Sequence, residues 1–360
     1  MKEFMSGTKI VCGAGAVRAL RDVNAKKLLV VTDPFFAKNG TAQKIAAAAN
    51  AQQVRIFDQV APDPTVGLVA EGTAVVREFG PDVMVALGGG SAMDCAKAML
   101  HFAGGETRLV AIPTTSGSGS EVTDFAILTH QSVKHPLIDS RLRPEMAILD
   151  EDLLTALPPS LVADGGFDVL SHALESFVAQ NASPFTDALA SAAFCSAFGS
   201  LPASFAGKVE VRGKVHIAAT MAGMAFTQAG LGVCHALSHS LGGMFHVPHG
   251  RLNAILLPSV ISCNAAAAGE KYARLARAAG LGGSAEAVAV RNLKNGLVRL
   301  RRELKLPETL AQAGVAPRDV WHAMNDIVSA ALNDPCCRTN PVRVEDFMLR
   351  QILEEVTGRV

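Results

Sequence analysis

Short β-branched apolar runs alternate with helical segments over about the first 150 residues of this 360-residue chain. The runs are typical of buried strands, and the segments between them have helical spacing. Strands separated by helices predict a parallel sheet with helices on both faces. The predicted strands are residues 27–33, 54–60, 82–90, 108–115 and 146–150, and the predicted helices are residues 67–80 and 91–102.

The pattern changes near Leu157-Pro158-Pro159, beyond which strand signals are few. Residues 161–180, 271–280, 292–306 and 344–356 all have helical periodicity. We therefore predict an α/β domain over residues 1–157 and an all-helical domain over residues 158–360. A cleft between two packed domains is a natural place for a ligand site.

The composition excludes several classes of protein. Apolar residues make up 49% and charged residues 18% of the chain, which suits a globular protein with part of its surface hidden in a homodimer or higher homo-oligomer. The formal net charge is zero and no basic run occurs, so neither nucleic acid nor an anionic membrane is expected as a partner.

The cysteine pattern and the first residues of the chain indicate a cellular compartment. Seven cysteines without a CxxC pair favour a reducing compartment, and the first residues contain no secretory h-region. No uninterrupted apolar stretch approaches the roughly 20 residues of a membrane helix. These features predict a cytoplasmic protein.

The segment GGGSAMDCAK (88–97) follows an apolar strand and opens a helix. Consecutive glycines let backbone amides approach a phosphate, and the helix N-terminus adds N–H donors and a partial positive charge. The usual GxGxxG fingerprint is absent. A plain strand-to-helix turn is the alternative, but three glycines exceed what a turn requires, which favours phosphate binding.

A second polar loop, PTTSGSGSEVT (113–123), follows the next predicted strand and offers the hydroxyls of Thr114, Thr115 and Ser118. By itself it could be an ordinary flexible loop. Two such loops at successive strand ends are typical of the two walls of a dinucleotide cleft. We therefore interpret residues 1–157 as a dinucleotide-binding domain.

Asp33 ends an early predicted strand. A carboxylate there can accept hydrogen bonds from a ribose hydroxyl and would repel a 2′-phosphate, which favours NAD over NADP. The alternative is an ordinary N-cap aspartate before Pro34.

Five residues are candidates for a metal site in the helical half. Asp168 and His172 are four residues apart in a helical stretch, as are His235 and His239, and His249 follows in a Pro-His-Gly turn. A lone histidine is more often a hydrogen-bonded core residue, but two such pairs and a third histidine favour a metal. A metal would also remove the cost of burying Asp168 unpaired. Spacing does not say which histidine is excluded.

Three imidazoles and one carboxylate suit a borderline ion such as Fe(II) or Zn(II). Such a site keeps one coordination position for a substrate oxygen, and the ion then acts as a Lewis acid.

The chain resembles the iron-containing (group III) alcohol dehydrogenases along nearly its whole length. The motifs that carry the resemblance are GGGSAMDCAK, IPTTSGSGSEVT, FDVLSHALE and GVCHALSHSLGGMFHVPHGRLNAILLP. Within the family it is most similar to the alcohol dehydrogenases of propanediol and ethanolamine utilisation, through SPFTDALA (183–190), MAGMAFTQAGLG (221–232) and RTNP (338–341). That likeness suggests a bacterial microcompartment and its enzymes as partners.

The resemblance implies the iron alcohol dehydrogenase fold, shared with dehydroquinate synthase: a Rossmann-like parallel-sheet domain followed by a helical domain. It places the metal ligands on Asp168, His172, His235 and His249, and His239 near the nicotinamide as the candidate catalytic residue. The implied cofactor contacts are Asp33, Gly88, Gly89, Gly90, Ser91, Asp94, Thr114, Thr115, Ser118 and Lys134.

Three departures from the family pattern stand out. Gly165-Gly166 replaces the usual Thr-Gly before the ligand aspartate, and NPVR (340–343) replaces NPR. The chain is also somewhat short, which affects surface loops and allows a different substrate pocket.

The function that the resemblance implies is reversible oxidation of a short-chain primary alcohol, 1-propanol or ethanol, by NAD with Fe(II), or Zn(II) as the alternative ion. A polyol dehydrogenase of the glycerol or butanediol type would share every motif. A dehydroquinate-synthase-like lyase should need more basic residues for its phosphate substrate. A non-catalytic NAD-binding assembly protein would be indicated by loss of a ligand, yet all four are present.

Overall fold

The computed structural model describes residues 4–130 and 133–358. Within them the chain forms two compact units. The sheet unit comprises residues 5–157, and the helical unit comprises residues 158–358 together with Phe4.

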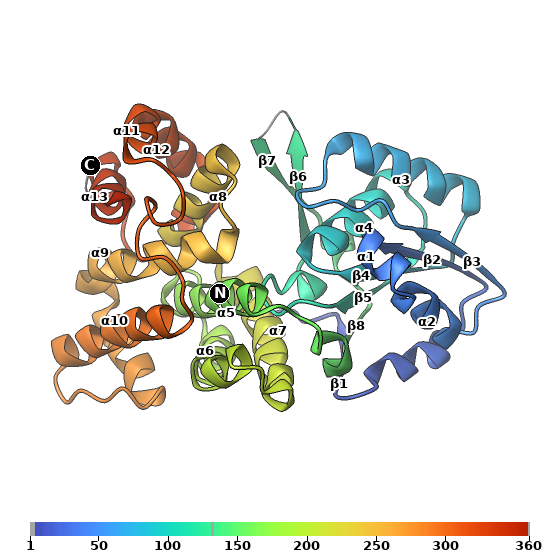
Figure 1. Cartoon of the computed structure of the whole chain (residues 1–360), viewed down its shortest axis with the longest axis horizontal. Coiled ribbons are helices and arrows are strands. Elements are labelled where there is room, and N and C mark those ends of the chain that lie inside the picture. Colours follow the sequence, from blue (N-terminus) through green and yellow to red (C-terminus); the bar gives the residue numbers. More distant parts are fainter. Residues whose placement is uncertain (1–3, 131–132, 359–360) are drawn as a thin grey trace. The chain divides into compact units, whose positions relative to one another are not determined.

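The sheet unit is built on a six-stranded sheet in the order β1-β8-β5-β4-β2-β3 (Figure 1). Every neighbouring pair is parallel, as the alternation of strands and helices predicted. The strands are β1 (Lys9–Cys12), β2 (Lys27–Thr32), β3 (Gln53–Phe57), β4 (Val83–Gly88), β5 (Arg108–Pro113) and β8 (Met146–Leu149).

Among the strands of this unit, β1 and a hairpin were not predicted, and neither were the short helices before β3. Strand β1 lies at the edge of the sheet and has only four residues, most of them exposed. Such a short strand produces no long apolar run in the sequence. An antiparallel hairpin, β6 (Phe125–His130) with β7 (Val133–Ile138), forms a separate two-stranded sheet. The predicted strand at 54–60 is shorter in the structure, where β3 ends at Phe57.

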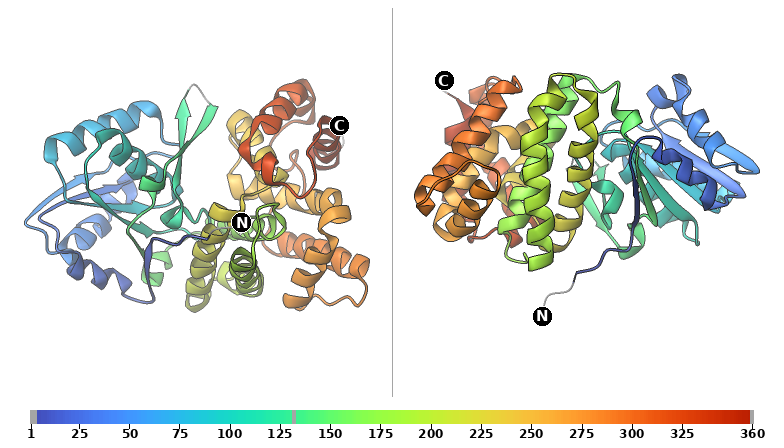
Figure 2. Two further views of the ribbon diagram at one scale, coloured as in Figure 1. Left: turned by 180° about the vertical axis from the view of Figure 1, so that it is seen from behind. Right: turned by 90° about the horizontal axis from the view of Figure 1, so that it is seen from below.

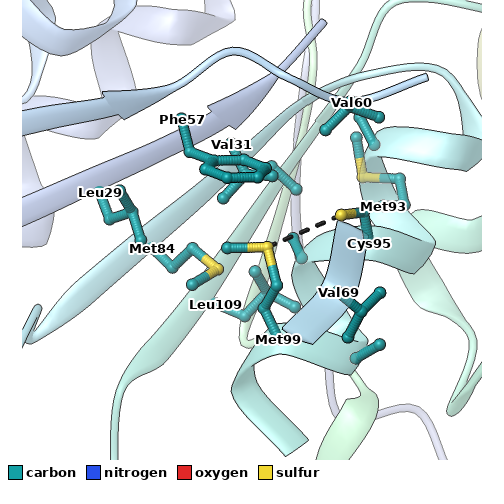
Figure 3. Packing of buried hydrophobic residues seen from close by; sticks show 14 of the residues in the cluster. Leu29, Val31, Phe57, Val60, Val69, Met84, Met93, Cys95, Met99 and Leu109 are labelled. Atoms are coloured by element: carbon teal, nitrogen blue, oxygen red, sulfur yellow. Dashed lines mark hydrogen bonds between the residues drawn. The ribbon is translucent and has the colours of Figure 1, made fainter. Parts of the chain in front are cut away.

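Alternate side chains of the central strands enter two different cores. Leu29, Val31 and Met84 face α3 (Val66–Phe79) and α4 (Gly90–Ala103), as Figure 3 shows for the cluster around Met99. Their neighbours Leu28 and Val30 face η1 (Ala16–Val23) and α2 (Thr41–Ala48). A strand buried on both faces must be apolar at every position, which explains the continuous apolar runs in the sequence.

The described residues after Leu157 contain helices and no strand. Helix α5, which carries two of the candidate ligands, packs against α6, α7 and α9, and Figure 2 shows the long helices of this unit lying side by side. The helices are α5 (Pro159–Val178), α6 (Pro184–Phe205), α7 (Arg212–Ala229), α8 (Val233–Phe245), α9 (His249–Ala278), α10 (Glu286–Glu303), α11 (Pro317–His322), α12 (Met324–Asn333) and α13 (Asp346–Thr357).

Helices α5 and α9 meet at a glycine. A β-carbon at Gly250 would overlap the backbone carbonyl of Asp164. The contact lies one residue from His249 and four from Asp168, so it sets how closely two of the candidate ligands approach. The side chains of Arg251 and Asp164 form an ion pair beside it at 2.9 Å.

Two helices of this unit are long and apolar enough to cross a membrane if length and composition alone are counted. They are α6 and α9, with mean hydropathy of 1.3 and 1.4, and a third candidate, residues 209–229 with 233–245, is bent by 104°. None is an uninterrupted apolar run, which is why the sequence pattern did not single them out. Most of the apolar window of α9, 72%, is buried inside the fold, which accounts for its composition.

Candidate metal centre and cofactor loops

Four side chains from three helices converge in the helical unit. Asp168 and His172 project from one face of α5, His235 from the first turn of α8, and His249 from the start of α9. Their ligand atoms all lie within 4.8 Å of one another.

The three imidazoles direct the same ring atom toward one carboxylate oxygen. The Nε2 atoms of His249, His172 and His235 lie 3.5, 3.8 and 3.9 Å from Asp168 Oδ1. The sequence placed His249 in a turn, and this is corrected: it is the first residue of the 30-residue helix α9, after Pro248 at the N-cap.

Burial and close spacing shift the pKa values of the side chains in this group. Burial raises the pKa of Asp168, but His172, His249 and His235 outweigh it and hold that pKa well below its usual range. Burial also lowers the pKa of His249 well below normal. The His249 side chain is 31% exposed against 6% for His172 and 1% for His235, so the group is open to solvent on the α9 side.

The donor set fits a divalent ion. Three imidazole nitrogens and one carboxylate oxygen are the ligands that Fe(II) and Zn(II) accept in proteins. Without a cation, an ionised carboxylate would be buried among imidazoles that cannot all be protonated together. The exposed side beside His249 leaves room for a further ligand.

Two buried residues orient these ligands, and sequence reasoning missed both. Glu175 accepts from the Nδ1 of His235 at 2.6 Å and from the backbone N–H groups of Gly232 and Cys234 at 3.0 and 2.7 Å. It therefore caps α8 and leaves Nε2 of His235 facing Asp168. Asn253 donates its Nδ2 to Asp168 Oδ1 at 2.9 Å.

A signal for Glu175 existed, since it follows His172 by three residues and so lies on the same face of α5. Asn253 follows His249 by four residues, but that spacing was no signal while His249 was placed in a turn, and its contact with Asp168 depends on how α9 packs against α5. Carboxylate and amide partners of this kind fix the tautomer and ring orientation of metal ligands.

His239 lies beside the four-residue group and not in it. Its ring stacks on that of His249, with centroids 5.2 Å apart and planes at 13°. Its Nδ1 lies 2.8 Å from Asp334 Oδ2, and Cys336 completes a second group of potential ligands. The i, i+4 pair of His235 and His239 is thus divided between two groups.

The three glycines shape the end of β4 in the sheet unit. Gly88 has φ of 149°, and a β-carbon there would lie 2.7 Å from that of Ala92. Gly89 is the N-cap of the 14-residue helix α4 and has no side chain to cover its first N–H groups. Ser91 and Asp94 lie in the first turns of α4.

The second polar loop lies directly against these glycines. A β-carbon at Gly89 would be 3.2 Å from Thr115 Oγ1, and one at Gly90 would be 3.2 Å from Ser118 Oγ. Thr114 donates its backbone N–H to the Gly88 carbonyl at 2.9 Å. The predicted neighbourhood of the two loops is therefore present, because β4 and β5 are adjacent strands.

A fully buried lysine, Lys97, ties the second loop to α4. Its Nζ donates to Ser120 Oγ, Thr123 Oγ1 and the carbonyls of Thr123 and Phe125, all between 2.8 and 3.2 Å. Ser120 in turn donates to Asp94 Oδ1 at 2.9 Å. Sequence reasoning missed Lys97, although it ends the GGGSAMDCAK motif.

Asp33 has the capping role that was its alternative interpretation. Its Oδ1 accepts from the backbone N–H groups of Phe35 and Phe36 at the start of α1 (Pro34–Lys38). Its Oδ2 faces Gly88, where a β-carbon would be 3.7 Å away. The two roles are compatible because they use different oxygens. Lys134 belongs to β7, but its side chain lies outside the described part of the chain.

Two family models match the chain. Residues 7–151 match the iron-containing alcohol dehydrogenase model, and residues 162–357 match the C-terminal model of the Fe-containing alcohol dehydrogenase family.

Relatives that match nearly the whole chain are named as alcohol dehydrogenases. The chain is 40% identical to 1-propanol dehydrogenase PduQ of Citrobacter freundii, over 99% of this chain and 100% of the relative. It is 34% identical to the NADPH-dependent butanol dehydrogenase of Clostridium saccharobutylicum, over 98% and 97%. The solved structure of a 1,3-propanediol oxidoreductase superposes with a TM-score of 0.94 at 30% identity, covering 99% of this chain and 100% of that one. By sequence and by fold, the chain belongs to the iron-containing alcohol dehydrogenase family and is an oxidoreductase that interconverts alcohols and aldehydes.

Proposed function

We propose that the chain is a metal-dependent, NAD(H)-linked dehydrogenase of short-chain primary alcohols, with 1-propanol and propanal or ethanol and acetaldehyde as the substrate pair. The observation that carries the proposal is the convergence of three Nε2 atoms on Asp168 Oδ1, in a group with one exposed side. The full-length similarity to a 1-propanol dehydrogenase supports the substrate class.

Asp168, His172, His235 and His249 would hold Fe(II), or Zn(II) as the alternative. A divalent ion bound there would supply Lewis acidity to a substrate oxygen. The chain contributes the orientation: Glu175 keeps Nδ1 of His235 protonated, and Asn253 holds the Asp168 carboxylate.

The cofactor would bind at the carboxyl ends of β2, β4 and β5. Gly88, Gly89, Gly90 and Ser91 would receive the pyrophosphate at the N-terminus of α4, which has no side-chain cap. Thr114, Thr115, Ser118 and Asp94 would line the other side, and Lys134 would add a further contact. NAD supplies the hydride acceptor.

We assign proton transfer to His239. The Asp334 carboxylate accepts from Nδ1, which leaves Nε2 as the basic atom of the ring. Nε2 could then take the proton that an alcohol releases and return one to an aldehyde.

The proposal is tested by an anaerobic panel of aldehydes and alcohols, with NADH and NADPH, on protein reloaded with Fe(II) or Zn(II). We expect rapid turnover of propanal or acetaldehyde with NADH only after reloading. His249→Ala should lose the metal. His246→Asn is the matched control, because His246 is an exposed histidine at the end of α8 with φ of 54°, which asparagine tolerates. Full turnover by metal-free protein would overturn the proposal.

A diol or polyol dehydrogenase is the second candidate, favoured by the similarity to the 1,3-propanediol oxidoreductase structure. Glycerol, butanediol and 1,3-propanediol in the same panel separate the two. A kcat/KM at least tenfold higher for a diol than for 1-propanol would favour the second candidate.

We propose further that the protein is cytoplasmic and forms a homodimer or higher homo-oligomer. Support for the oligomer comes from β1, an edge strand whose apolar side chain Ile10 is 37% exposed. The relative named 1-propanol dehydrogenase PduQ also makes a bacterial microcompartment a proposed location. Light scattering of the pure protein and cell fractionation test the two statements separately.

A further inference from the structure

We propose that His239, Asp334 and Cys336 form a second binding site for a divalent metal of the zinc class, separate from the four-ligand site. One atom from each residue, an imidazole nitrogen, a carboxylate oxygen and a thiol sulfur, lies within 4.8 Å of the other two. Nitrogen, oxygen and sulfur ligands at such spacing are those that Zn(II) takes in proteins, with water as a fourth ligand.

The three side chains are held by rigid elements. His239 lies in the middle of α8, and Asp334 is the N-cap of η6 (Pro335–Thr339), where it accepts the backbone N–H of Cys336 at 2.8 Å. The far end of η6 is fixed as well, since Thr339 donates its hydroxyl to the Leu231 carbonyl at 2.7 Å. The donors are thus preorganised rather than carried on a free loop.

The imidazole nitrogen and the carboxylate oxygen need only a small shift to bind one ion. Ligand atoms about 2.1 Å from a tetrahedral ion lie about 3.4 Å apart. Nδ1 of His239 and Oδ2 of Asp334, now hydrogen bonded at 2.8 Å, would therefore separate by roughly half an ångström. The side chain of His239 is 30% exposed, so an ion can reach the group from solvent.

Charge also permits a second cation. Asp334 and the thiolate of Cys336 would contribute two negative charges, so the second site would be neutral when filled. On binding, the thiol proton goes to solvent, and the imidazole proton moves from Nδ1 to Nε2. Since Nε2 of His239 is the atom assigned to proton transfer, we expect a metal here to inhibit; this expectation rests on the proposed function.

Co(II) added to metal-free protein tests the site itself, because the four-ligand site contains no sulfur. We expect a thiolate-to-cobalt charge-transfer band in the near ultraviolet as the second equivalent binds. Cys336→Ser should abolish the band. Cys337→Ser is the matched control and should retain it, since the Cys337 thiol is directed to the Ala331 carbonyl at 3.0 Å. Absence of the band at saturating Co(II), or its persistence in Cys336→Ser, would overturn the proposal.

Zn(II) added to the loaded enzyme tests the consequence. We expect one further equivalent to bind and turnover to fall at least tenfold, with recovery when a weak chelator removes that equivalent. Cys336→Ser should need at least tenfold more zinc for the same fractional loss. Equal inhibition of both proteins would overturn the inhibitory role. A cobalt band without zinc inhibition would support the site and contradict the assignment of His239, so the two failures are distinguishable.

Discussion

The carboxylate of Asp334 and the imidazole of His239 are joined at 2.8 Å, between Oδ2 and Nδ1. Burial raises the pKa of Asp334, but the hydrogen bond from His239 helps lower it to about 2. The carboxylate is therefore ionised near neutral pH and can only accept. Nδ1 of His239 must carry the proton, and Nε2 is the ring atom left to act as a base.

Asp334→Asn should reduce kcat about 10- to 100-fold. An amide can donate to Nδ1 and so stabilise the wrong tautomer of His239. The four-ligand site should keep its one equivalent of metal per chain, because neither residue belongs to it. Steady-state kinetics with parallel metal analysis checks this. A variant with wild-type kcat and pH profile would remove Asp334 and His239 from the proton path.

Glu175→Gln should weaken metal binding about 10- to 100-fold, measured by competition with a chelator. The substitution leaves the size of the side chain unchanged but replaces one of two acceptor oxygens, which serve His235 Nδ1 and the Cys234 N–H, by an amide donor. Asn340→Ala is the control, because Asn340 Oδ1 accepts the backbone N–H of Val233 in the same helix turn without touching His235. If both variants lose metal equally, helix capping rather than ligand orientation explains the effect.

Gly250→Ala should destabilise the protein by at least about 2 kcal/mol and lower its metal content. The added methyl would overlap the Asp164 carbonyl and push α9, with His249, away from α5. In contrast, Gly199→Ala in α6 meets nothing within 4 Å and should stabilise by about 0.5–1 kcal/mol. Thermal unfolding of the metal-free proteins checks both, and a neutral Gly250→Ala would show that the helices can shift.

Lys97→Met should cost about 3 kcal/mol and weaken NADH binding, since it releases the loop at residues 113–125 from α4. Burial lowers the pKa of Lys97 to about 8. Between that pH and about 10.5 the unfolded chain binds more protons, so this residue's contribution to stability rises with pH. Denaturant unfolding at several pH values should show that rise in wild type and not in Lys97→Met.

Asp33→Asn should raise the NADPH-to-NADH ratio of kcat/KM about tenfold or more, because the charge that repels a 2′-phosphate is lost. The asparagine oxygen can still cap α1 through the N–H groups of Phe35 and Phe36, so the fold should be unchanged. Kinetics with both cofactors and a circular dichroism spectrum test this. An unchanged ratio would mean that Asp33 has only the capping role.

Much of the fold and the site followed from the sequence. Strands β2, β4 and β5 can be recognised in the sequence as continuous apolar runs, because both faces of each strand pack against helices. Asp168 with His172, and the three-glycine turn before α4, depend on local spacing alone. Such features are readable because a helix or a strand end places neighbouring residues predictably.

The tertiary structure decided which distant residues meet. The partners of Glu175, Asn253 and Asp334 cannot be read from the spacing within their own segments, because only the packing of α5, α8 and α9 with η6 brings these partners together. The same packing divides His235 and His239, identical in spacing to a ligand pair, between two groups of residues. Local sequence sets what a helix face presents, whereas the contact between helices, through close approaches such as Gly250 on Asp164, sets what that face meets.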